Sequence, residues 1–148
     1  MRTVLALLAA TVGAGFQTGN YATSPVPPPS GPYANIHFTA GKHRVSHFGI
    51  VVIRTPCHGP IARFHKSGAL GGGGFFTSPI DKHDRFKIRI YESHGGETGT
   101  ISGLLHGTTA SGTVTLQTHF FLPSVPNPRG PSHCEVKNLP WTVSTQFG

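Results

Sequence analysis

The residues with the clearest potential for chemistry in this sequence are two pairs, each a cysteine next to a histidine. Cys57 precedes His58, and His133 precedes Cys134, which Glu135 follows. If the cysteines form a disulfide, the two histidines arrive on either side of it. Two imidazoles and a carboxylate oxygen are ligands that zinc and copper accept. The sequence therefore predicts a surface metal site at His58 and His133, with Glu135 as an oxygen ligand. Solvent-facing histidines that hold no metal are the alternative.

A second candidate is a strand with alternating basic residues. Arg85, Lys87 and Arg89 occupy every second position, and Tyr91 continues the series. These side chains could contact an anionic ligand, with the basic groups following its charges and the tyrosine ring stacking on it. The ligand could be an anionic glycan, a cell-wall polymer or nucleic acid, and the plain alternative is the solvated face of a strand. The chain has 12 Lys and Arg against five Asp and Glu, a net charge of +7, which suits anionic partners.

Several catalytic classes lack their motifs in this chain. There is no Gly-x-Ser-x-Gly, Gly-x-x-x-x-Gly-Lys, His-Glu-x-x-His or Gly-x-Gly-x-x-Gly sequence. A glycine run such as residues 71–74 can form a phosphate-binding loop, but here no Lys-Ser/Thr and no helix start follows it. It is therefore interpreted as a mobile loop. A glycosidase pair would have to come from only five acids, and turn positions suit most of them better. The sequence predicts no catalytic residues and no cofactor.

The elements that must position these residues are strands. Apolar residues alternate with polar ones at 85–91 and 113–117, and residues 48–53 are apolar on both faces. Residues 100–104 and a turn around Gly107 complete a hairpin with 113–117. Shorter candidates are residues 35–39, 75–78 and 141–146. With 20 glycines, 13 prolines and no helical spacing, the chain is predicted to be all-β. We expect an antiparallel β-sandwich or flattened β-barrel of about seven or eight strands.

The N-terminus is predicted to be a signal peptide, residues 1–14. Arg2 supplies the positive charge, and residues 4–10 form a short apolar stretch. Small residues place the cleavage site after Ala14, with Ala22 as a later option. The apolar stretch is too short for a comfortable membrane span, so the processed protein is expected to be secreted and not membrane-spanning.

Export determines the expected domain organisation and the state of the cysteines. Residues 15–34 contain a proline-rich stretch at 24–32 and are predicted to be a flexible linker. Residues 35–148 then form a single β domain. An oxidising compartment favours a disulfide between Cys57 and Cys134 over reactive thiols.

Several residues dispersed along the folded part form a recognisable set: Cys57, Ile80, Arg85-Phe86, Ile101-Ser102-Gly103, Ala110-Ser111-Gly112-Thr113, Cys134 and Trp141-Thr142. With this set the chain resembles a family of small exported β-proteins from actinobacteria. In its usual form the family has a Gly-x-Phe hairpin and a Cys-x-x-Gly...Trp-x-Ala ending. This chain departs from it at Val143, in its glycine tract and in its ten histidines.

The resemblance implies a compact β-fold without an assigned activity. It also implies a disulfide between an early strand and the last segment, with Trp141 as a core anchor and Gly103 and Gly112 at hairpin or bulge positions. Together the observations favour a secreted, non-catalytic binding or structural module at or outside the cell envelope. Its partner would be an anionic envelope polymer or another protein, and not a specific nucleic acid. The alternative is a small secreted hydrolase or a His-dependent metal-binding protein.

Overall fold

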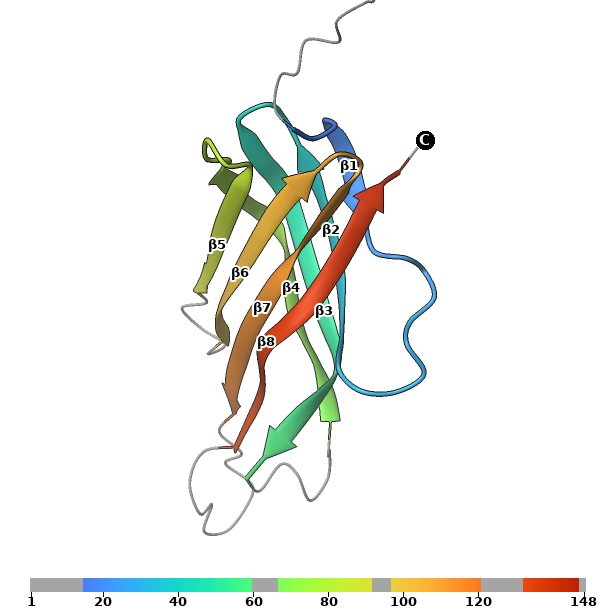
Figure 1. Ribbon diagram of the computed structural model, residues 1–148. Coiled ribbons are helices and arrows are strands. Elements are labelled where there is room, and N and C mark those ends of the chain that lie inside the picture. The colour runs from blue at the N-terminus through green and yellow to red at the C-terminus, as the bar shows by residue number, and fades with distance from the viewer. Residues whose placement is uncertain (1–14, 60–66, 92–96, 121–131, 147–148) are drawn as a thin grey trace, which may run out of the picture.

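The computed structural model describes residues 15–59, 67–91, 97–120 and 132–146, and these residues form eight strands and no helix (Figure 1). The strands are β1 (Gly19–Ala22), β2 (Tyr33–Ala40), β3 (Arg44–His58), β4 (Ser67–Pro79), β5 (Arg85–Tyr91), β6 (Glu97–His106), β7 (Thr109–Phe120) and β8 (Ser132–Thr145). The predicted all-β class and strand number are therefore confirmed. Among the described residues, no helix is long and apolar enough to cross a membrane.

All eight strands belong to one antiparallel sheet in the order β4-β3-β2-β1-β8-β7-β6-β5. The sheet folds over on itself, so that β5 to β8 lie against β2 to β4 (Figure 1). The end of β3 also pairs with β8. Between the outermost strands, the Ser78 hydroxyl donates to the Lys87 carbonyl oxygen at 2.9 Å. The result is consistent with the expected sandwich or flattened barrel.

The core lies between the two layers and contains a cluster of aromatic rings. Phe38 of β2 stacks on Tyr21 and Phe48, with ring centroids 5.1 and 5.7 Å apart. From the opposite layer, Phe86 and Trp141 meet Phe38 edge to face. All five side chains are at most 4% exposed. Burying side chains of this size supplies much of the hydrophobic stabilisation of the fold.

Two glycines make room for this cluster. Phe86, Gly103, Gly112 and Trp141 are successive neighbours across β5, β6, β7 and β8. The Phe86 and Trp141 rings lie 6.2 Å apart, and both come within 3 Å of where a Gly103 Cβ would be. Gly103 and Gly112 therefore lie directly opposite each other inside the β6–β7 hairpin, and their role is close packing.

The folded part begins earlier than the sequence analysis expected. Residues 15–34 were predicted to be linker, yet β1 lies within them and β2 begins at Tyr33. Phe16 is 8% exposed and Tyr21 is 1% exposed, so both belong to the core. A four-residue strand with one buried aromatic residue is too short to produce a recognisable periodicity. The predicted signal peptide, residues 1–14, lies outside the described residues.

The glycine run at residues 71–74 is also corrected. It lies within β4, where Gly71 pairs with Val51 and Gly72 pairs with Ile50. Glycine has a low strand propensity and gave no strand signal of its own. The long neighbouring strand β3 provides the hydrogen-bonding partner that keeps the run extended.

Candidate functional site

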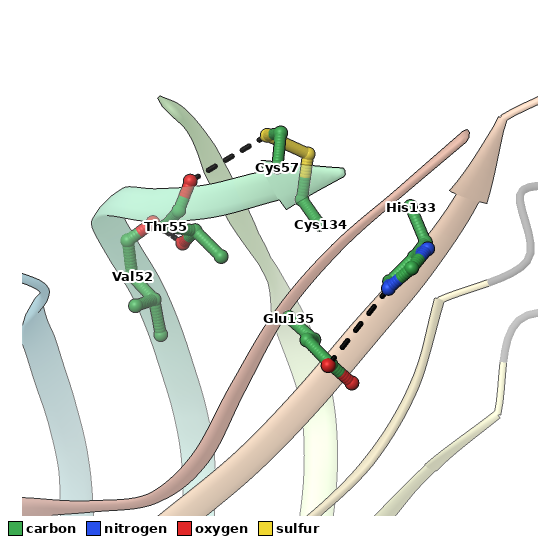
Figure 2. The surroundings of a disulfide bond; sticks show 6 residues. All are labelled: Val52, Thr55, Cys57, His133, Cys134 and Glu135. Carbon is green, nitrogen blue, oxygen red and sulfur yellow. Dashed lines mark hydrogen bonds and ion pairs between the residues drawn. A yellow bond between two sulfur atoms is a disulfide. The ribbon is translucent and has the colours of Figure 1, made fainter. Parts of the chain in front are cut away.

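The predicted disulfide between Cys57 and Cys134 is present and joins positions 77 residues apart in the sequence. It lies where the end of β3 pairs with the start of β8, with the two cysteines as direct partners. The Cys57 sulfur lies 3.5 Å from the Thr55 carbonyl oxygen, and the Thr55 hydroxyl donates to the Val52 carbonyl at 3.1 Å (Figure 2). Both cysteines are buried, so the bridge anchors this end of the sheet in the core.

The same pairing brings the predicted metal ligands together. His58 pairs directly with His133, and their ring centroids are 5.1 Å apart. Glu135 lies two residues beyond His133 on β8 and therefore on the same face. The His133 Nε2 is 3.8 Å from the Glu135 Oε1 (Figure 2). One ligand atom from each of the three residues lies within 4.8 Å of the others.

This cluster can hold a divalent cation after a small side-chain rearrangement. Zinc bonds to nitrogen and oxygen of about 2.0–2.2 Å in a tetrahedron require ligand atoms roughly 3.4 Å apart. His58 is exposed, and His133 and Glu135 are partly exposed, so these side chains can rotate toward a shared ion. Three protein ligands would leave the fourth zinc position to water. The structure thus brings His58, His133 and Glu135 together as predicted.

The predicted basic strand is β5, and its alternation is confirmed. Arg85, Lys87, Arg89 and Tyr91 are exposed, and the three residues between them are buried. Successive outward side chains on a strand are about 7 Å apart. Tyr91 is 72% exposed, which leaves its ring available for stacking. We name these four residues the basic face.

Hydroxyl side chains, which the sequence analysis did not identify, continue this surface. In the sheet register, β6 places Ser102, Thr100 and Thr98 beside Lys87, Arg89 and Tyr91. On the next strand, Thr113 and Thr115 lie beside Ser102 and Thr100. The signal was the alternation of Thr and Ser with apolar residues and glycine along both strands. We name the five hydroxyl residues the hydroxyl rows.

Two hollows lie along the basic face. The larger, of about 640 Å³, has Arg85, Lys87, Ser102 and Thr113 among its lining residues. The smaller, of about 340 Å³, is lined by Lys87, Arg89, Ile90, Tyr91, Thr98, Gly99 and Thr100. Lys87 borders both hollows, so they follow one another along β5.

Asp81 shapes the turn that leads into the basic face. Its carboxylate accepts hydrogen bonds from the backbone N–H groups of Arg85, at 3.0 Å, and His83, at 2.8 Å. These two hydrogen bonds lower the pKa of Asp81, the one from Arg85 most strongly. The ionised carboxylate also borders the larger hollow, where it would oppose an anion at that end.

Comparisons with family models, curated proteins and solved structures found no match for this chain. The class defined by the fold is an all-β domain with one disulfide.

Proposed function

We propose that this protein is an exported binding domain that recognises an anionic polymer of the cell envelope through the basic face. The observation that carries the proposal is the arrangement of three cationic side chains and an exposed tyrosine on one strand, beside hydroxyl rows and two hollows. The net charge of +7 adds long-range attraction for such a partner.

The spacing of the groups suits a repeating ligand. Cations about 7 Å apart along β5 can meet successive negative charges of an extended chain. The hydroxyl rows can donate to phosphate or sugar oxygens, and the Tyr91 ring can stack on a sugar. Because these groups extend over three strands, we favour a polymer over a small compact anion. The competing hypothesis is a protein partner with an acidic surface.

Secretion is part of the proposal. The disulfide is compatible with an oxidising compartment, and residues 1–14 have the pattern of a signal peptide. The resemblance to small exported actinobacterial β-proteins stays a prediction and carries no assigned activity.

Removing charge from the basic face is expected to weaken polymer binding. For Lys87→Gln with Arg89→Gln, we expect the Kd for purified teichoic acid to rise about tenfold or more at low salt. The slope of log Kd against the logarithm of the salt concentration should fall by roughly two, because two fewer counterions are displaced on binding. Calorimetry between about 20 mM and 300 mM salt measures both quantities.

The matched control is Lys42→Gln with Arg44→Gln. Both residues are exposed, they lie in the β2–β3 turn and at the start of β3, and neither lines either of the two hollows, so the variant removes equal charge away from the basic face and the hydroxyl rows. Its Kd should change by no more than about twofold. An equal loss in both variants would mean that net charge alone drives binding. Binding of an acidic protein in place of the polymer would also contradict the proposal.

A second candidate function, metal binding, is favoured by the cluster of His58, His133 and Glu135. Zinc titrated into the protein at about pH 7.5 should bind at one site, and His58→Ala with His133→Ala should weaken binding at least about tenfold. Binding should also weaken in acid, because histidine ligands must be deprotonated. The control is His43→Ala with His106→Ala, which alters exposed histidines elsewhere. Zinc binding that survives the loss of His58 and His133 rules out this site.

A further inference from the structure

The first described residues of the chain are held tightly against the fold. The backbone N–H of Gln17 donates to the Gly107 carbonyl, and the Gly107 N–H donates to the Gly15 carbonyl, both at 2.7 Å. Phe16, between them, is 8% exposed and belongs to the core. The Tyr21 hydroxyl donates to the Gln17 carbonyl. Gly15, Phe16 and Gln17 are therefore anchored to the sheet.

Gly15 also contacts an acidic side chain that is distant in sequence. Its backbone nitrogen donates to the Asp84 Oδ2 at 3.1 Å. A Cβ at position 15 would lie 3.0 Å from the same oxygen, so glycine allows this close approach. Asp84 precedes β5, and its carbonyl accepts from the Leu105 N–H at 2.9 Å, which connects it to β6.

We propose that the Ala14–Gly15 bond is the maturation site and that cleavage creates an ion pair between the new N-terminus and Asp84. A leader peptidase hydrolyses this amide with one water molecule. Ala14 leaves with a carboxylate, and the Gly15 nitrogen becomes an ammonium with three N–H donors. The hydrogen bond from a neutral amide to the Asp84 carboxylate thereby becomes an ion pair with an ammonium donor. This inference rests on the export within the proposed function, but not on the ligand.

The alternative cleavage site, after Ala22, is incompatible with the fold. Cleavage there would remove Phe16, Tyr21 and all of β1, which lies between β2 and β8 in the sheet. The stack of Tyr21 on Phe38 would be lost with it. Cleavage after Ala14 instead leaves Phe16, Tyr21 and all of β1 in the chain.

The pairing links maturation to the basic face. Asp84 adopts a positive φ of 60° in the turn before β5, a conformation that Asp and Asn tolerate better than most residues. An ammonium held against its carboxylate would fix this turn and hence the start of β5. Only the processed chain, whose N-terminus is a free ammonium, can form this ion pair.

The cleavage site is tested on the full chain expressed in a secreting bacterial host. Intact mass and N-terminal sequencing of the exported protein should identify Gly15 as the first residue. A first residue of Thr23, or retention of residues 1–14, would overturn the inference.

The ion pair is tested by comparing the mature protein with a form acetylated at Gly15, in the native sequence and in Asp84→Asn. Acetylation keeps one N–H donor but removes the charge, and Asn suits the positive φ. We expect acetylation to lower Tm by about 1–4 °C at low salt in the native sequence. It should have little effect in Asp84→Asn or in about 1 M salt. Equal shifts in both backgrounds would overturn the pair, whereas teichoic acid binding, measured separately, would still decide the proposed function.

Discussion

Replacing Gly112 with alanine is expected to destabilise the protein by roughly 3 kcal/mol or more. A Cβ at this position would overlap the Ser102 carbonyl oxygen and lie 2.9 Å from the Gly103 Cα. Both atoms are backbone, so no side-chain rotation can relieve the overlap. The hairpin strands β6 and β7 would have to separate in the middle of their pairing. Urea unfolding followed by Trp141 fluorescence measures the loss.

Gly41→Ala is the matched control for this substitution. A Cβ at Gly41 would contact only the Arg44 carbonyl oxygen, at an ordinary 3.5 Å. The free energy of unfolding of the Gly41→Ala variant should therefore stay within about 1 kcal/mol of the native value. Similar losses for Gly112→Ala and Gly41→Ala would mean that the close approach of β6 and β7 is not what requires glycine.

Removing the disulfide is expected to have the other large effect. For Cys57→Ala with Cys134→Ala, chain entropy predicts a loss of roughly 4 kcal/mol, because the bridge closes a 77-residue separation. The variant should also bind zinc more weakly, since the bridge holds His58 beside His133. Chemical denaturation and zinc titration measure the two effects.

Reduction provides the control for the cysteine variant. A reductant should lower the free energy of unfolding of the native protein by a similar amount and should leave the double-alanine variant unchanged. If the double-alanine variant has the same denaturation midpoint as the native protein, the bridge contributes nothing to stability, and the entropic argument is contradicted.

The sequence allowed β5 and the β6–β7 hairpin to be predicted, because their side chains alternate with period two. The cluster at the disulfide was predictable for a related reason. Cys57-His58 and His133-Cys134 run in opposite order, which matches antiparallel pairing of cysteine with cysteine and histidine with histidine. Local pattern and long-range register agree at these positions.

The features that were missed depend on partners far away in the sequence. β1 is too short to show a period, and it is held by β2 and β8 on its two sides. The glycine run of β4 is extended because β3 pairs with it. The hydroxyl rows become one surface only when β5, β6 and β7 are placed in register. The alternation of Thr and Ser could be read from the sequence, but the strand pairings that join these residues into one surface could not.

A binding footprint by NMR tests most directly whether the basic face binds the polymer. Teichoic acid is added to the ¹⁵N-labelled mature protein in about 50 mM salt, and the backbone amide signals are followed. We expect the largest shifts on residues 85–91, 98–102 and 113–115. Shifts concentrated around His58 and His133, or spread evenly over all basic residues, would contradict a binding role for the basic face.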